Sequence, residues 1–392
     1  MKALICGAGI AGLTLAVRLE HHGWNVTVVD RADTPRQQGY MMDFYGLGFQ
    51  AVKAMGLERQ LRMHASRVGE FRYVDSNGRT SVSLDYDVFV KALDGDVVGI
   101  MRPALERMLR HALGDGVQVR YGTTITRLDD MTAELSDGTA MEPDVIVGAD
   151  GIHSHIRALT FGPERDCLHY LGMHTSAFAF HDPELFDKVH GQFLLTETLD
   201  RQLGLYGLQE GHVAAFTVHR SPDETPPDDA REELRGEFCG MGDLVDRAMA
   251  HCPPSTQMYY DTVAQIIMPQ WTRGRIALVG DAAHAVSLVA GQGASLGVAG
   301  AYVLAEMLAT QSSVPDALIE YERRWRPVAT GIQDASRERG IEVFLPSSPR
   351  TLLLRRWGVR AMRVPGLHQV MVRSLVPKSR ETITELSAPA RR

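Results

Sequence analysis

A glycine motif near the start of the chain constrains the fold more than any other feature. Residues 7–12 read GAGIAG, a GxGxxG pattern that follows a short apolar run, Lys2–Cys6. Apolar residues at helical spacing follow over Ile10–His22, and a second apolar run covers Asn25–Asp30. The order strand, glycine turn, helix and strand is that of a dinucleotide-binding βαβ unit.

Each glycine of the motif suits a different physical task. Gly7 allows a tight turn, Gly9 lets the backbone approach a pyrophosphate, and Gly12 lets the helix pack close to the strand. Asp30 ends the second strand, where its carboxylate can accept hydrogen bonds from an adenosine ribose. The sequence therefore predicts a dinucleotide site, with a purely structural glycine turn as the alternative.

Two further acidic turns follow buried apolar runs. Asp150 and Gly151 end one run, from which the carboxylate could reach the pyrophosphate loop through water; an ordinary turn is the alternative. Gly280 and Asp281 end another. Ligands of open α/β sheets bind at the carboxyl ends of strands, so these positions predict that a ligand binds at this edge of the sheet.

A long uncharged segment follows Asp281. No Lys, Arg, Asp or Glu occurs from Ala282 to Ala305, and Gly293 and Gly297 form a GxxxG, which together suit a membrane helix. However, the segment also carries an Ala-Gly-Gln-Gly turn, whose polar groups are unfavourable in hydrocarbon. We therefore expect a strand end, a turn and a helix buried inside one protein, without membrane contact.

Bulk composition excludes several classes of function. Hydrophobic residues make up 44% and charged residues 23% of the 392 residues, as in a soluble globular protein. A net charge of −7 argues against nucleic-acid binding. The four cysteines are scattered and no histidines have metal-ligand spacing, so we expect no disulfide framework, no metal and a reducing, cytoplasmic location.

The nucleotide-type segments are interrupted twice by antiparallel patterns, including a hairpin over residues 70–90 and a small meander that begins at Val117–Tyr121. We therefore expect two interleaved domains followed by C-terminal helices. The expected boundaries are residues 1–70, 100–165 and 270–330 for the dinucleotide domain, 71–99 and 166–269 for the β-sheet domain, and 331–392 for the helices.

The C-terminal region is basic, with 12 Lys and Arg against 5 Asp and Glu in residues 331–392. Arginines alternate with apolar residues there, which would suit an amphipathic helix at a membrane surface. We favour a helix that bridges the two domains, because Pro365 and Gly366 break the apolar face.

The chain resembles the class A flavoprotein monooxygenases of the p-hydroxybenzoate hydroxylase fold in four motifs and in their order and spacing. These motifs are GAGIAG, Arg102 in IMRPALERML, VIVGADGIHSHIR and GDAAH…AGQG. The stretch GYMMDFYGLGFQAVKAMGL resembles the tetracycline-hydroxylase-like branch. The resemblance covers residues 1–330. It implies an α/β fold, in which a doubly wound, glutathione-reductase-like FAD-binding domain is interleaved with an antiparallel β-sheet substrate domain.

The resemblance also implies site residues. Arg36 would lie near the adenine, Arg102 near the chain between adenosine and flavin, and Asp281 at the ribitol and pyrophosphate, while the backbone of residues 291–294 would face the flavin pyrimidine ring. The full set of expected FAD contacts is Gly7, Gly9, Ile10, Ala11, Gly12, Asp30, Arg31, Arg36, Asp43, Arg102, Asp150, Gly151, Gly280, Asp281, Gly291, Gln292, Gly293 and Ala294.

One segment departs from the family. Relatives usually have one or two prolines between GDAAH and GQG, whereas this chain has Ser287, Leu288 and Val289. Those prolines shape the wall near the reacting carbon of the flavin. Their absence bears on oxygen activation and on substrate placement.

The resemblance implies an enzyme that uses NADPH or NADH as a transient reductant. Dioxygen would form a flavin 4a-hydroperoxide, which hydroxylates an aromatic or polycyclic small molecule, as in secondary metabolism or antibiotic modification. Baeyer–Villiger or epoxidising chemistry and a flavin-binding protein without oxygenase activity are the alternatives. No residue is assigned as catalytic acid or base, and either a monomer or a homodimer is expected. Candidate substrate contacts are Met173, Phe178, Phe180, Phe193, Tyr206 and Phe216.

Overall fold

The structure is a computed structural model that describes residues 1–36, 39–66, 68–129, 132–361 and 381–388. Its first sheet has the order β17-β18-β11-β1-β2-β7, and every pairing except that of β17 is parallel. The central strands are buried apolar runs because helices cover both faces of the sheet. The strands are β1 Lys2–Cys6, β2 Asn25–Asp30, β7 Val117–Tyr121, β11 Val145–Gly148, β17 Thr272–Arg273 and β18 Ile276–Leu278.

The expected meander begins later than predicted. Val117–Tyr121 is β7, an edge strand parallel to β2, rather than part of the meander. The three-stranded meander is formed by β8 Ile125–Asp129, β9 Thr132–Leu135 and β10 Ala140–Met141. The pairing of β7 joins segments about 90 residues apart, so the local pattern could not reveal it.

The uncharged segment forms a helix inside the protein. α11 (Gly293–Thr310) is long and apolar enough to cross a membrane, but 72% of it is buried within the structure. Gly297 brings α11 close to Ala11 of α1 (Ile10–His21), where an added Cβ would lie 3.7 Å from the Ala11 Cβ. The GxxxG spacing therefore serves helix packing within one chain.

Close packing recurs where α11 meets α12 (Val314–Ala335). A Cβ added to Gly300 would overlap the indole nitrogen of Trp325, which donates a hydrogen bond to His284 Nε2 at 3.0 Å. We expect Gly300→Ala to lower the free energy of unfolding by about 1–3 kcal/mol, measured by chemical denaturation. Gly236 is the matched control: it is also helical but has open space around it, so Gly236→Ala should stabilise the protein by up to about 1 kcal/mol.

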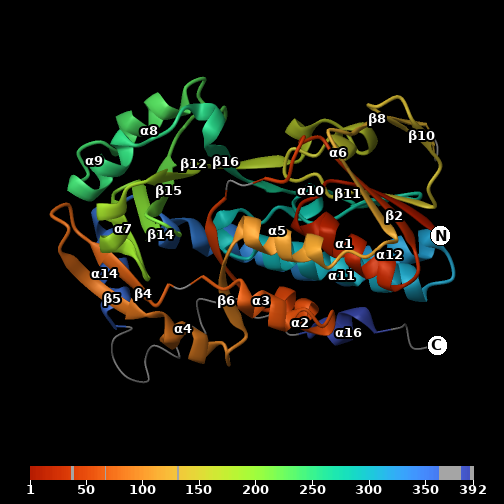
Figure 1. Ribbon diagram of the computed structural model, residues 1–392, viewed down its shortest axis with the longest axis horizontal. Coiled ribbons are helices and arrows are strands. Elements are labelled where there is room, and N and C mark those ends of the chain that lie inside the picture. Colours follow the sequence, from red (N-terminus) through yellow and green to blue (C-terminus); the bar gives the residue numbers. More distant parts are fainter. Residues whose placement is uncertain (37–38, 67, 130–131, 362–380, 389–392) are drawn as a thin grey trace.

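The second sheet has the order β16-β12-β15-β14-β13-β4-β5 and is antiparallel except for the β4–β13 pair. Figure 1 shows this sheet beside the first one, with α8 and α9 at its outer side. Its strands are β4 Glu70–Val74, β5 Thr80–Asp85, β12 Leu168–His181, β13 Gln192–Thr198, β14 Arg201–Gly207, β15 His212–Arg220 and β16 Tyr259–Ile266. The associated helices are α7 Pro183–Val189, α8 Ala230–Phe238 and α9 Asp243–Ala250.

The hairpin predicted over residues 70–90 ends early, because Asp85 caps a helix, α4 (Tyr86–Ala92), by accepting a hydrogen bond from the Asp87 amide. β3 and β6 form a separate two-stranded sheet. In the sequence, each of these two strands lies between a strand of the first sheet and a strand of the second. The remaining elements are β3 Met41–Tyr45, α2 Leu47–Ala54, α3 Glu58–Met63, β6 Val97–Met101, α5 Arg102–His111, α6 His155–Thr160, α10 Asp281–His284, α13 Ile341–Phe344, α14 Pro349–Ala361 and α16 Ile383–Ser387.

The described part of the basic C-terminal region contacts both halves of the molecule. Arg355 and Arg356 of α14 pair with Glu197 of β13, at 3.0 and 3.2 Å. The backbone of Ile383 in α16 donates to the side chain of Gln50 in α2. The arginines thus offset acidic charge in the body of the protein, as the bridging interpretation requires. Pro365 and Gly366 lie outside the described residues.

Candidate cofactor site

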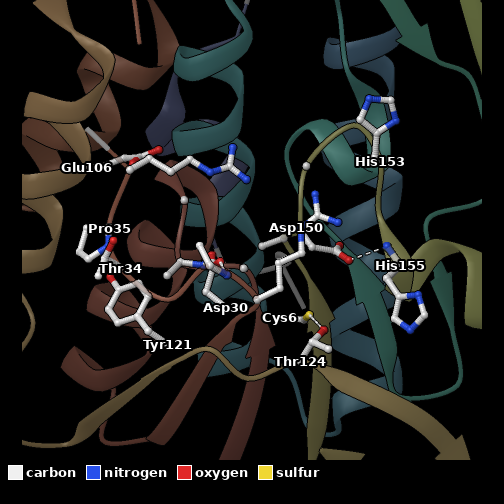
Figure 2. A pocket seen from close by; sticks show the side chains of 18 of the residues that line it. Cys6, Asp30, Thr34, Pro35, Glu106, Tyr121, Thr124, Asp150, His153 and His155 are labelled. Carbon is white, nitrogen blue, oxygen red and sulfur yellow. Dashed lines mark hydrogen bonds between the residues drawn. The ribbon is translucent and has the colours of Figure 1, made fainter. Parts of the chain in front are cut away.

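A cavity that is partly open to solvent lies at the carboxyl ends of β1, β2 and β11. This is the edge at which an open α/β sheet binds its ligands. Figure 2 shows side chains from several separate segments of the chain converging on it. Eight of the expected FAD contacts line this cavity: Gly7, Gly9, Asp30, Arg31, Arg36, Arg102, Asp150 and Gly151.

The three motif glycines meet different surroundings. Gly7 has a φ of +114°, and a Cβ there would overlap the carbonyl oxygen of Ala149. A Cβ on Gly12 would overlap the carbonyl oxygen of Gly7. A Cβ on Gly9 would meet only Glu106 Oε1, at 3.9 Å, so the space above this backbone is open. Gly7 and Gly12 thus shape the turn, and Gly9 leaves room for a ligand.

Two acidic side chains that line the cavity accept hydrogen bonds from the backbone of the loops around it. Asp30 accepts hydrogen bonds from the Ala8 amide at 2.7 Å and from the Ala32 amide at 2.9 Å. Asp150 accepts from the Ser154 hydroxyl at 2.5 Å and from the first amides of α6. Burial raises the pKa of Asp150, while the hydrogen bond from Ser154 opposes that rise. Both carboxylates therefore fix the loops around the cavity.

Arg102 connects this cavity to the second acidic turn. Its Nη2 atom lies 3.3 Å from Glu106 Oε1. Burial lowers the pKa of Arg102, but the negative charge of Glu106 and the nearby Tyr40 and Asp281 outweigh it. The Asp281 side chain is exposed, yet the surrounding protein desolvates it enough to raise its pKa, an effect that Arg102 opposes.

The second acidic turn leads directly into the α11 segment. Gly280 has a φ of +63°, and a Cβ there would lie 2.8 Å from that of Ala11. A Cβ on Gly293 would lie 3.8 Å from Asp281 Oδ1, so the N-terminus of α11 adjoins this carboxylate. The remaining expected contacts in this part are Gly291, which has a left-handed φ of +63°, Gln292, which is buried, and Ala294, which is partly buried.

Three expected contacts in the first helix do not line the cavity. Ile10 and Gly12 are buried, and Ala11 packs against α11. They shape the turn and the helix beneath it. Asp43 also lies outside this cavity, and its carboxylate accepts a hydrogen bond from Tyr86 at 2.8 Å. Burial raises the pKa of Asp43, and the Tyr86 hydrogen bond opposes the rise.

His153, which was not predicted, lines the cavity beside the Asp150 loop (Figure 2). Its ring nitrogens lie 3.2 Å from Asp261 Oδ1 on β16 and 3.0 Å from Glu164 Oε1. The hydrogen bond to Asp261, together with Glu164, raises the pKa of His153 to about 9. This imidazolium therefore links the cavity loop to the second sheet.

This ion pair predicts a pH-dependent contribution to stability. Because the pKa is raised, the stabilisation is fully present below about pH 6.5, the ordinary value, and is lost as the pH rises through 9. We expect the Tm difference between wild type and His153→Asn to be largest near pH 6 and to shrink towards about pH 10. His155→Asn, at another cavity-lining position, is the control; a pH-independent difference for His153→Asn would contradict the assignment.

The candidate substrate residues divide between the two faces of the second sheet. Strand pairing places Phe193, Tyr206 and Phe216 on one face, together with Met173. Phe178 and Phe180 point the other way, into the core beneath α8 and α9, where they are buried. The prediction is therefore wrong for these two residues, because the opposite face of the sheet has its own helical cover.

The face that carries Phe216 meets the first half of the molecule. The Tyr40 ring lies 5.4 Å from that of Phe216 and 6.0 Å from that of Tyr259. Tyr206 stacks on Phe193 at 5.4 Å, and its hydroxyl accepts a hydrogen bond from the Met41 amide at 2.8 Å. Half-buried aromatic rings thus gather next to the elements that hold Arg102 and Asp281.

The segment that lacks the family's prolines forms part of an apolar cluster. Ser287 has a φ of +67°, in the left-handed region. Leu288 and Val289 pack against a cluster that includes Met173, together with Phe344 of α13. In this chain the segment is therefore held by aliphatic and aromatic contacts.

The first sheet is doubly wound and carries a glycine turn, acidic residues at its strand ends and an adjoining helix N-terminus. An antiparallel sheet with aromatic residues lies beside it. Together these features define a dinucleotide-binding flavoprotein. The family model described as FAD binding domain matches residues 1–336. The chain belongs to this family and is a FAD-dependent monooxygenase.

Curated relatives and solved structures agree with this assignment. A flavin-dependent monooxygenase from an unknown prokaryotic organism is 29% identical over 89% of this chain and 91% of its own. A FAD-dependent monooxygenase of Sarocladium schorii is 26% identical over 94% of both chains. The tetracycline destructase Tet(51) is similar in fold, with a TM-score of 0.80 and 24% identity over 97% of this chain and 99% of its own. HpxO of Klebsiella pneumoniae, solved with FAD and uric acid, has a TM-score of 0.75 and 22% identity over 96% of both chains.

The residues present fit FAD. Open space lies above Gly9, and Arg31, Arg36 and Arg102 line the same cavity, which suits a pyrophosphate. Sequence reasoning missed several other lining residues: Cys6, Tyr121, Thr124, His153 and Glu106. Of these, Glu106 carried a usable signal, because it lies one helical turn after Arg102.

Proposed function

We propose that the protein is an NAD(P)H-dependent hydroxylase of aromatic or polycyclic small molecules. The observation that supports this most directly is the group of half-buried aromatic rings, Tyr40, Phe216 and Tyr259, next to Arg102 and Asp281. Such rings favour a flat, apolar substrate, which they would orient by stacking.

Bound FAD would accept a hydride from the nicotinamide and activate dioxygen. The protein's own residues would bind and orient. Arg102 would hold the negatively charged cofactor chain, and Asp281 would accept hydrogen bonds from its hydroxyls. The N-terminus of α11, at Gly293, would favour negative charge on the reduced ring. Leu288 and Val289 would keep water from the substrate side.

The test uses the holoprotein with NADPH or NADH, in air enriched in ¹⁸O₂. Fused-ring ligands come first, because two structural neighbours are a tetracycline destructase and a protein solved with uric acid. We expect ligand-dependent oxidation of the nicotinamide and a product that gains one ¹⁸O atom as a hydroxyl. A product with an inserted ester oxygen would instead favour Baeyer–Villiger chemistry. No flavin reduction with any ligand would favour a flavin-binding protein without oxygenase activity.

A further inference from the structure

The segment 285–290, which connects α10 to α11, has a backbone conformation that a proline could not adopt. Ser287 has a φ of +67°, whereas a proline fixes φ at about −65°. The Ser287 side chain does not hold the segment either, because its hydroxyl has no hydrogen-bond partner within the described residues. The shape of the segment must therefore be fixed by the elements packed around it.

Two buried glutamines bind consecutive carbonyl groups at the start of this segment. The Nε2 atom of Gln333 donates to the Ala285 carbonyl at 2.8 Å, and that of Gln265 donates to the Val286 carbonyl at 3.3 Å. Gln265 is fully buried and Gln333 is 3% exposed. Because one glutamine belongs to β16 and the other to α12, the backbone is held from two separate elements.

A π-helical turn joins the two glutamines. It covers Ser336–Gly340, between α12 and α13, and such turns frequently occur at functional sites. Ser336 Oγ accepts a hydrogen bond from Gln265 Nε2 at 2.9 Å and donates one to the Gln333 carbonyl at 2.8 Å. The three side chains therefore form one buried network, to which the Ser336 hydroxyl is central.

The π-helical turn also limits the position of Val289. A Cβ added to Gly340 would lie only 2.8 Å from Cγ1 of Val289. Leu288 and Val289 pack against the cluster that contains Met173 of the second sheet. The segment then leads into residues 291–294, whose backbone is expected to face the flavin ring. The network thus fixes a wall between the second sheet and the expected place of the ring.

We propose that the network of Gln265, Gln333 and Ser336 positions the segment 285–290 against the flavin ring and thereby keeps solvent away from it. These three residues are positioning residues, because they act through the backbone carbonyl groups of the segment. The inference rests on the part of the proposed function in which Leu288 and Val289 exclude water. It requires neither a particular substrate nor a nicotinamide.

The first test compares Ser336→Ala with Ser176→Ala in the full chain. Ser176 is the matched control, because its buried hydroxyl also has a hydrogen-bond partner, Thr217 at 2.6 Å, but lies in the second sheet. Amide hydrogen exchange of residues 287–292 is measured by mass spectrometry on the flavin-free protein. We expect exchange to be about three- to tenfold faster in Ser336→Ala, as for loss of one hydrogen bond, and unchanged in Ser176→Ala.

The second readout is the access of solvent to the bound flavin. With FAD bound, iodide should quench the flavin fluorescence of Ser336→Ala at least about twofold more strongly than that of the wild type, because the wall opens more often. Gly340→Ala reaches the same wall by displacing Val289, so it should change both readouts in the same direction and carries the test if Ser336→Ala does not fold. Gly331→Ala, on the exposed side of α12 with open space around it, is its control.

Several outcomes would overturn the proposal. It is wrong if Ser336→Ala and Gly340→Ala behave as the wild type in both readouts, or if Ser176→Ala changes them equally. Loss of FAD from Ser336→Ala would assign the network to cofactor binding itself and would also contradict the proposal. Neither readout uses turnover, so a protein that hydroxylates no ligand would count against the proposed function while this result stands.

Discussion

Arg102→Ala is expected to yield a colourless protein. The substitution removes a partly buried cation, expected beside the cofactor chain, and leaves Glu106 in the cavity wall without its ion-pair partner. A hydrogen bond between charged groups contributes about 1.5–3 kcal/mol, so FAD affinity should fall by about ten- to a hundredfold. The measurement is the absorbance ratio of flavin to protein after purification, followed by titration with added FAD.

Arg107→Ala is the matched control for this experiment. Arg107 lies on the same helix, α5, but is exposed. This variant should retain stoichiometric yellow cofactor. If Arg102→Ala also purified with a full complement of FAD, Arg102 would not be a cofactor contact.

Gly12→Ala is expected to destabilise the FAD-binding half of the molecule and to abolish FAD binding. The new methyl group would overlap the Gly7 carbonyl oxygen, which is backbone and cannot rotate away. The helix start would have to move off β1, at a cost of about 3 kcal/mol or more. We expect a Tm lower by roughly 5–10 °C and no bound flavin, measured by thermal unfolding and absorbance.

Gly9→Ala provides the contrast to this result. Its methyl group meets no backbone and approaches only Glu106, so the fold should remain and Tm of the flavin-free protein should change by less than about 2 °C. The methyl group would nevertheless occupy the space that the pyrophosphate needs, so FAD should be lost. A folded, yellow Gly9→Ala variant would contradict the placement of the cofactor above this residue.

Local signals predicted the first half of the site well. Lys2–Cys6 and Asn25–Asp30 are strands with the predicted bounds, because apolar runs and a glycine turn specify a βαβ unit within about 30 residues. The helix after the motif ends one residue earlier than predicted. The uncharged segment also forms the expected strand end, turn and buried helix, since its polar turn excluded a membrane span.

The errors concern contacts between distant segments. Alternation along β12 separates Met173 from Phe178, but a sheet covered on both faces gives no local indication of which face adjoins the site. Nothing near Asp43 in the chain reveals that its carboxylate accepts a hydrogen bond from Tyr86. The spacing of Glu106 one turn after Arg102 indicates an ion pair, but nothing local in the sequence shows that this pair is placed at the cavity.

The two walls of the site differ in how their shape is encoded. On the FAD side, Gly7 and Gly12 leave no room for a side chain, so any substitution there has to displace backbone. In the segment that the resemblance places on the substrate side, Leu288 and Val289 pack through aliphatic contacts, which tolerate volume-conserving exchanges at less than about 1.5 kcal/mol. Mutational drift can therefore reshape the substrate side while the cofactor side stays fixed. A lineage of such enzymes can change substrates without losing its flavin.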